Sequence, residues 1–151
     1  MKTTQEWLDQ YGESHTNPTN KLIHWICIPA IVVSLLGILS SVPMPWAATH
    51  INLATLFVVF SLGFYSLLSI RLMLGMAVVS SASYAVAVAL GGLPVPLWIT
   101  SLAIFAVAWV FQFVGHKIEG KKPSFFVDLQ FLLIGPLWLL SFVYRKLGIA
   151  Y

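Results

Sequence analysis

Three histidines, His15, His24 and His116, are the residues of this chain whose type and placement best suit chemistry. Imidazole is the commonest protein ligand for iron, zinc and copper. A histidine in or beside lipid is costly unless it is paired, so each is by default a candidate functional residue. His116 lies far along the chain from the other two. A metal site is therefore expected only if the helices bring all three to one side of a membrane.

The composition is that of a membrane protein. The chain has 151 residues, 59% of them hydrophobic and 9% charged, whereas a soluble domain is about half apolar and about a quarter charged. Its apolar residues come in runs near 20, the length that crosses a hydrocarbon core of about 30 Å. We expect an all-α, multi-pass transmembrane bundle, with residues 1–151 forming a single integral membrane domain. No basic stripe with interleaved aromatic residues accompanies the net charge of +3, so nucleic acid binding is not expected.

Turn and breaker residues predict four or five spans. Asn17-Pro18 is a favourable helix start. The apolar run 47–90 would be about 60 Å long as one helix, about twice the thickness of the hydrocarbon core. This run must therefore fold back, and we expect the turn near Arg71, the only charged residue within it. The expected spans are about 18–41, 49–69, 72–90, 97–116 and 125–144.

Two segments at the ends of the chain need separate treatment. Residues 1–17 form a surface segment, in which the spacing of Trp7, Leu8 and Tyr11 predicts a short helix over 3–13. This helix is either amphipathic and bound at the membrane surface or an ordinary polar N-terminal helix. Gly135-Pro136 falls in the middle of the last segment, which is either a kinked fifth span or a re-entrant hairpin.

Charge distribution predicts which side faces the cytoplasm. If the first four spans alternate, one side holds all five acids together with Lys2, Lys21, Arg71, Lys117, Lys121 and Lys122, and the opposite inter-span loops hold no Lys or Arg. The positive-inside rule then makes the charged side cytoplasmic, in a bacterial inner membrane or the endoplasmic reticulum. Topology alone explains Arg71 and the lysines, although they could also attract an anionic head group.

Helical phase adds polar neighbours to the histidines. Asn20 and His24 share a face of the first span, and Gln112, His116 and Glu119 share a face at the end of the fourth. We predict His15, His24, His116 and Glu119 as metal ligands and catalytic residues, with Asn20 and Gln112 orienting the imidazoles. Nitrogen and carboxylate ligands with open positions suit Fe²⁺ used with oxygen.

Other polar residues have simpler interpretations. A single boundary histidine is more often a hydrogen-bonded interfacial residue than a ligand, and His50, expected on the opposite side without partners, is interpreted in that way. Asp128 in the first turn of the last segment suits the helix dipole. Cys27, in an apolar helix, is interpreted as inert core.

Two segments resemble a known family. His15-Thr16-Asn17-Pro18-Thr19-Asn20-Lys21-Leu22-Ile23-His24, followed by Ile28-Pro29, is similar to the N-terminal motif of the small membrane 2-hydroxy fatty acid dioxygenases of fatty-acid α-oxidation. Trp109-Val110-Phe111-Gln112-Phe113-Val114-Gly115-His116, then Glu119 and Lys122-Pro123, resembles the second motif of that family. The resemblance covers most of the chain in length and order, and the two motifs together are fairly specific.

The resemblance implies an Fe²⁺-dependent enzyme that uses O₂ to convert a 2-hydroxy fatty acid to the acid one carbon shorter. Its motif histidines, carried over as His15, His24 and His116, would be required for activity. Pro123-Ser124 stands where the family often has Pro-Ala, and the stretch 137–142 lacks the acid that some members carry there. Two other classes of function stay open: a b-type haem held by His24 and His116, and a non-catalytic membrane scaffold or transporter component.

Overall fold

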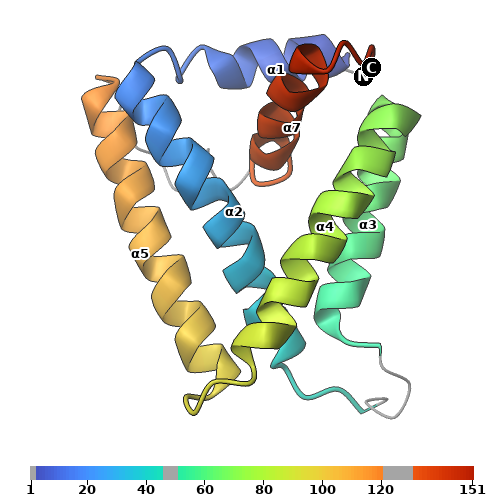
Figure 1. Ribbon diagram of the computed structural model, residues 1–151, viewed down its shortest axis with the longest axis vertical. Helices are drawn as coiled ribbons and strands as arrows, with labels where there is room; N and C mark the ends of the chain where they lie inside the picture. The colour runs from blue at the N-terminus through green and yellow to red at the C-terminus, as the bar shows by residue number, and fades with distance from the viewer. Residues whose placement is uncertain (1–2, 46–50, 121–130) are drawn as a thin grey trace.

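The fold consists of helices in the part of the chain that the structure, a computed structural model, describes, which is residues 3–45, 51–120 and 131–151. Within those ranges there are six helices and no strand (Figure 1). They are α1 (Thr4–Gly12), α2 (Pro18–Ser40), α3 (Leu53–Leu68), α4 (Ile70–Leu90), α5 (Leu97–Ile118) and α7 (Ile134–Lys146). The expected all-α class is confirmed.

Three helices, α2, α4 and α5, are long and apolar enough to cross a membrane, with 23, 21 and 22 residues. Helix α3 is apolar but has only 16 residues, which is about 24 Å of helix. It begins later than predicted because Asn52 caps it, accepting a hydrogen bond from the backbone N–H of Thr55. Helix α2 starts as predicted, with Asn17 as its N-cap and Pro18 in its first turn.

The chain folds back two residues before the predicted position. Ser69, not Arg71, separates α3 from α4, and it has extended backbone angles. Its N–H donates to the carbonyl of Tyr65, and its hydroxyl accepts from the N–H of Leu72. A single residue with a side chain that caps the next helix is therefore enough to make the turn.

The last helix does not run the full length of the bundle. Helix α7 has 13 residues, about 20 Å, and Gly135-Pro136 lies in its first turn, where proline is tolerated because the missing N–H would have no helical partner. Helix α7 starts inside the bundle and ends beside both chain termini (Figure 1). Tyr144 near its end donates to the carbonyl of Arg71, 2.7 Å away. The end of α7 is therefore fastened to the start of α4; residues 125–130 of the predicted span lie outside the described residues.

Helix α1 lies across the same end of the bundle (Figure 1). Thr3 and Glu6 form a capping box at its start. Its buried residues, Leu8 and Tyr11, belong to the same hydrophobic core as Leu137 and Trp138 of α7. The prediction of a helix with one apolar face is confirmed, and that face packs against the protein.

Helices α2 and α5 approach each other closely at two glycines. A Cβ atom on Gly37 of α2 would collide with Ser101 of α5, and a Cβ atom on Gly115 of α5 would collide with Asn20 of α2. Glycine is needed at both places because the partner side chain occupies the space a methyl group would fill. The second contact lies one residue from His116, so it fixes the distance between two of the histidine-bearing elements.

Candidate metal centre

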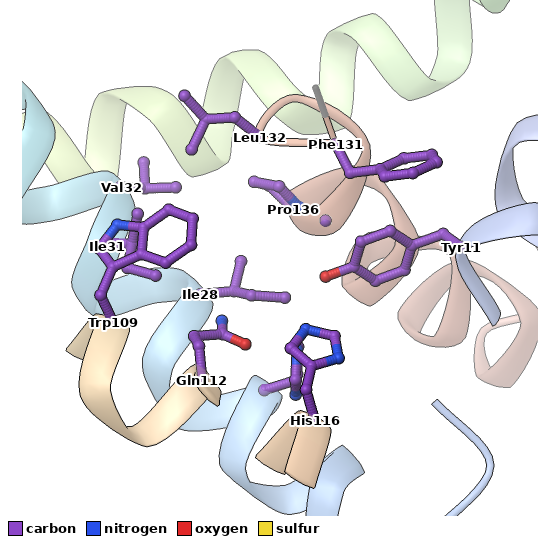
Figure 2. Close-up of a pocket in the computed structure, with 12 residues that line it drawn as sticks. Tyr11, Ile28, Ile31, Val32, Trp109, Gln112, His116, Phe131, Leu132 and Pro136 are labelled. Atoms are coloured by element: carbon purple, nitrogen blue, oxygen red, sulfur yellow. The ribbon is translucent and has the colours of Figure 1, made fainter. Parts of the chain in front are cut away.

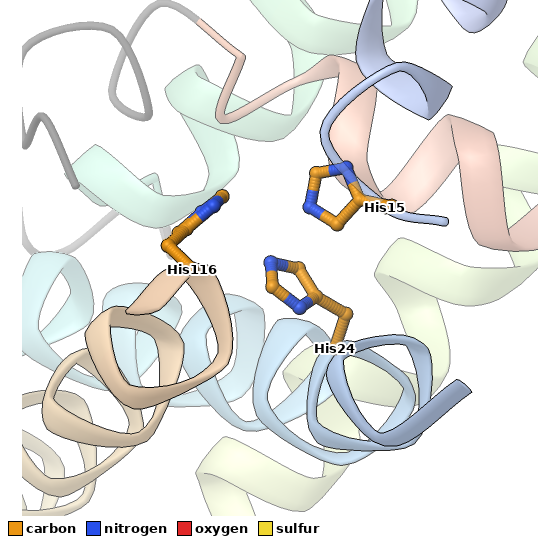
Figure 3. Close-up of side chains that lie close together, drawn as sticks. All are labelled: His15, His24 and His116. Atoms are coloured by element: carbon orange, nitrogen blue, oxygen red, sulfur yellow. The ribbon is translucent and has the colours of Figure 1, made fainter. Parts of the chain in front are cut away.

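The three histidines meet at one end of the bundle. His24 comes from α2, His116 from the last turn of α5, and His15 from the segment that joins α1 to α2 (Figure 3). Ring centroids lie 4.1 Å apart for His15 and His24, 5.3 Å for His15 and His116, and 5.1 Å for His24 and His116. All three are buried, with exposed fractions of 3%, 1% and 6%. The fold thus joins residues that are about a hundred positions apart.

The geometry fits a metal ion. One ligand atom from each ring lies within 4.8 Å of the others, and among the described residues the cluster contains no acid or cysteine. Two nitrogens bound to one ion at about 2.1 Å can be at most about 4.2 Å apart. A small inward movement of the rings would bring all three nitrogens within reach of one ion.

Backbone carbonyls set the orientation of two rings. Nδ1 of His15 lies 2.6 Å from the carbonyl oxygen of Tyr11, and Nδ1 of His24 lies 2.9 Å from that of Asn20. A carbonyl can only accept, so each Nδ1 carries the proton and donates it. Nε2 of each ring is then the atom that would bind a metal, and the carbonyls are the outer partners that metal-bound histidines require.

Aromatic rings hold His15 in place. The Tyr11 ring stacks on it with a centroid distance of 4.3 Å and an angle of 11°, and Trp138 of α7 lies 5.2 Å from it. His15 follows the end of α1, so packing of α1 against α7 decides where this ring lies. Helix α7 contributes to the site through Trp138, although it carries none of the histidines.

Asn20 connects the histidines to the chain around them. It is fully buried; its amide nitrogen donates to the carbonyl of Ser14 and to the carboxylate of Glu119, both at 3.0 Å. Its own backbone carbonyl accepts a hydrogen bond from Nδ1 of His24. One residue therefore contacts the loop before α2, the end of α5 and one imidazole.

Glu119 is not part of the histidine cluster, and its carboxylate contacts the start of α2. Its carboxylate accepts hydrogen bonds from the backbone N–H of Thr16 and of Asn17, from the Thr16 hydroxyl, and from the Asn20 amide. Burial raises its pKa, but these hydrogen bonds outweigh burial and hold the pKa at about 2. The carboxylate is thus an acceptor for N–H groups at the start of α2, where negative charge is favourable.

A cavity of about 40 Å³ adjoins the histidines and is called here the histidine cavity. Its polar end is formed by Tyr11, His24, Gln112 and His116, and its far end by apolar side chains that include Ile28, Val32, Leu132 and Pro136 (Figure 2). The Gln112 side chain, 6% exposed, lies at this polar end, beside two histidines rather than on lipid. One polar end and one apolar end suit an amphiphilic ligand.

Sequence reasoning missed the residues that support the site from α1 and α7. Tyr11 stands four residues before His15, the spacing of neighbours on a helix face, and this spacing was a usable signal. Nothing in the local sequence indicates Trp138 or Pro136, because their place depends on the return of α7 into the bundle. His50 and Asp128 lie outside the described residues. Arg71 donates to the carbonyl of Ala150, 2.9 Å away.

Comparison with known proteins agrees with this picture. A family model described as "2-hydroxy-palmitic acid dioxygenase Mpo1-like" matches residues 1–147. The chain is 32% identical over 150 residues to "2-hydroxy-palmitic acid dioxygenase MPO1" of Saccharomyces cerevisiae, a match covering 91% of this chain and 78% of that relative. No solved structure matches the chain. The matched region contains all three clustered histidines, together with Asn20, Gln112 and Glu119. The chain belongs to the Mpo1-like family.

Proposed function

We propose that this protein is an Fe²⁺-dependent oxygenase that converts 2-hydroxy fatty acids to acids one carbon shorter with O₂. The observation that carries the proposal is the buried cluster of His15, His24 and His116 beside a cavity with an apolar far end. The printed name of the yeast relative, a 2-hydroxy-palmitic acid dioxygenase, supports both the substrate class and the use of oxygen.

The proposed metal is chosen by its chemistry. Three neutral imidazoles suit zinc, copper or iron, but zinc has no redox chemistry, and an oxygenase requires a metal that exchanges electrons. Iron bound by Nε2 of His15, Nε2 of His24 and one ring nitrogen of His116 would supply both Lewis acidity and electron transfer to O₂. Glu119 is not included in this ligand set, because its carboxylate is already occupied by hydrogen bonds.

The proposed reaction balances without a further reductant. A 2-hydroxy acid and O₂ give the shorter acid, CO₂ and water. The bond between the carboxyl carbon and the carbinol carbon breaks, the carbinol carbon becomes the new carboxyl carbon, and the old carboxyl carbon leaves as CO₂. Both carbons are oxidised, together by the four electrons that reduce O₂, so the substrate itself is the reductant.

The residues of the chain would bind and orient the substrate. The carboxylate and hydroxyl would lie at the polar end of the histidine cavity, where the Gln112 amide can donate to an oxygen of the substrate. Apolar side chains such as Ile28 and Val32 would exclude water from the reacting carbons. The Nδ1 atoms of His15 and His24 keep their protons and donate them in hydrogen bonds to the backbone carbonyls, which would hold both rings in one orientation.

We further infer that the histidine end of the bundle faces the cytoplasm. Lys21 and Lys117 flank the site in sequence, and Arg145 and Lys146 end α7, which returns to the end where α1 lies (Figure 1). The opposite connections, 41–52 and 91–96, contain no charged residue. This asymmetry supports a cytoplasmic active face under the positive-inside rule.

The haem alternative is less well supported by the geometry. Two axial histidines must leave room for a flat macrocycle between them, whereas the His15 ring lies 4.1 Å from that of His24 and 5.3 Å from that of His116. The adjoining cavity of about 40 Å³ is also far smaller than a porphyrin needs. A Soret absorption band in the purified protein would nevertheless favour a haem protein over the proposed oxygenase.

The test is metal content together with turnover. The protein is purified in detergent, loaded anaerobically with Fe²⁺, and its iron is counted by mass spectrometry before 2-hydroxypalmitate and O₂ are added. We expect about one iron per chain and formation of pentadecanoate with CO₂. His24→Ala should lose both iron and turnover, while His50→Ala, the same change at the fourth histidine, should keep both. Absence of the shorter acid from iron-loaded wild type would reject the oxygenase, and equal iron in His24→Ala would favour the scaffold.

A further inference from the structure

The histidine cavity is too small for a whole fatty acid, so the remainder of the acyl chain needs another place. Its volume is about 40 Å³. Two other cavities share its apolar end. The first, here the outer slot, measures about 180 Å³ and lies between α2, α4 and α7. The second, here the inner cavity, measures about 30 Å³ and lies between α2, α3 and α4.

Shared wall residues make these cavities direct neighbours of the histidine cavity. Ile28, Val32 and Pro136 line both the histidine cavity and the outer slot. Val32 and Pro136, with Leu132, also line the inner cavity. Val32 lies eight residues after His24, about 12 Å further along the axis of α2. A chain that starts at the histidines and follows α2 therefore reaches Val32 and Pro136, where two routes are available.

Size and enclosure favour the outer slot. The inner cavity is bounded by Leu36, Tyr65 and Met76, which are 1–2% exposed, and the Tyr65 hydroxyl closes it with a hydrogen bond to the carbonyl of Leu133. The outer slot is bounded by Trp25 and Val143, about 40% exposed. It therefore reaches the outer surface of the bundle, where the apolar helices would meet lipid, and an acyl chain can enter it sideways.

We propose that the acyl chain of the substrate runs from the histidine cavity past Val32 and Pro136 into the outer slot between α2, α4 and α7. This inference rests on the proposed function for the identity of the occupant. It assigns a place to Pro136, which has no role in metal binding: the proline at the start of α7 forms part of the bend that the tail must pass. It also assigns selection for chain length to Val79 and Ser83 of α4 and to Leu140 and Val143 of α7.

Two serines of α4 provide a matched pair of variants. Ser83 lines the outer slot and Ser80, three residues earlier, lines the inner cavity; both are buried. Each methylene that enters an apolar site contributes about fourfold to kcat/KM. In Ser83→Leu the added side chain displaces two or three methylenes, so the ratio of kcat/KM for 2-hydroxypalmitate over 2-hydroxyoctanoate should fall about tenfold or more. Ser80→Leu should keep the wild-type ratio.

A direct label locates the tail without turnover. The protein is incubated with 2-hydroxypalmitate that carries a diazirine on its terminal carbon, and the complex is irradiated. The modified peptides are then identified by mass spectrometry. We expect modification in α4 and α7 around Val79 and Val143, and its loss when unlabelled 2-hydroxypalmitate is added in excess. Val143→Trp, a change at a half-exposed position, should also abolish the modification of α4 and α7. This variant takes the place of Ser83→Leu if Ser83→Leu does not fold, or does not bind iron, as wild type does.

The outcomes separate this inference from the proposed function. Turnover together with labelling of α3 around Phe57 and Val58, or with a changed chain-length ratio in Ser80→Leu alone, would place the tail in the inner cavity and overturn the inference. Labelling of the outer slot in a protein without turnover would support the tail site and reject the oxygenase. Labelling that excess 2-hydroxypalmitate does not reduce, or no labelling at all, would mean that the slot holds ordinary membrane lipid and would overturn the inference.

Discussion

Adding one methyl group at Gly115 should disturb the candidate metal centre without touching a histidine ligand atom. In Gly115→Ala the new Cβ would collide with the side-chain oxygen of Asn20 and lie 3.5 Å from Cε1 of His24. Asn20 cannot move aside easily, because it is fully buried and its amide nitrogen is fixed by the Ser14 carbonyl and the Glu119 carboxylate. The methyl group must therefore separate α2 from α5 or break those two hydrogen bonds.

Gly63→Ala supplies the reference for the size of this effect. Gly63 is exposed inside α3, and a Cβ there would meet nothing within 4 Å. Both substitutions gain about 0.4–1 kcal/mol by restricting the unfolded chain. Only Gly115→Ala also has an overpacking cost of about 1–3 kcal/mol. The difference between the two variants therefore isolates the cost of packing at the site.

The assay is thermal unfolding in detergent, followed by tryptophan fluorescence, with iron counted on the same samples. A difference of 1 kcal/mol moves Tm by about 2–4 °C for a chain of this size, so Gly115→Ala should unfold several degrees below Gly63→Ala. Moving Asn20 also displaces the carbonyl partner of His24, which should weaken metal binding by about 10–100-fold. If both variants unfold at the same temperature and bind metal equally, the close contact between α2 and α5 at Asn20 is not as described.

Two further substitutions test the residues around the histidines. Glu119→Gln replaces a carboxylate that accepts from four donor groups by an amide that also donates, so it should lower the free energy of unfolding by about 1–2 kcal/mol. Its iron content should stay that of wild type, because the proposed ligand set does not include Glu119. Loss of iron in this variant would return the carboxylate to the ligand set. The pKa of Glu119 is about 2, against an ordinary value of 4.5. The stability that the ionised carboxylate contributes is therefore complete above pH 4.5 and is lost as the pH falls toward 2. The free energy of unfolding of Glu119→Gln should depend less on pH in that interval than that of wild type. Tyr11→Leu removes the ring stacked on His15 and should weaken iron binding by up to about tenfold, whereas Tyr11→Phe keeps the ring and should bind iron as wild type does; equal binding by Tyr11→Leu and Tyr11→Phe would show that stacking does not position His15.

Helical phase explains why much of the site could be predicted from sequence. Asn20 and His24 are four residues apart within α2, and Gln112 and His116 are four apart within α5, so each pair must share a face whatever the rest of the chain does. The caps at Asn17 and Pro18 are equally local, and α2 begins there. That the two faces meet is a property of packing: alternation of the spans places both at one side of the membrane, but periodicity alone does not bring them into contact.

Glu119 shows the limit of reasoning from helical phase. Helix α5 ends at Ile118, and Glu119 is its C-cap, so the phase that places Gln112 beside His116 no longer fixes the direction of the next side chain. The direction is set instead by N–H groups at the start of α2, about a hundred residues away, which favour a carboxylate. The same limit applies to Gly135-Pro136. An apolar run with a proline in it has the same periodicity whether the helix is kinked there or begins there.

The position of α1 and α7 bears on how a lipid would reach the histidines. From the polar end, the cluster is covered by Tyr11 and Trp138 and by the loop fastened to Glu119, and the imidazoles are at most 6% exposed. Opening that side would separate the Tyr11 ring from His15 and break several charge-assisted hydrogen bonds. The outer slot requires no such change, because Trp25 and Val143 are already half-exposed at its edge. On the proposed function, entry between α2, α4 and α7 is therefore the route that keeps the metal ligands in place while a long acyl chain comes and goes.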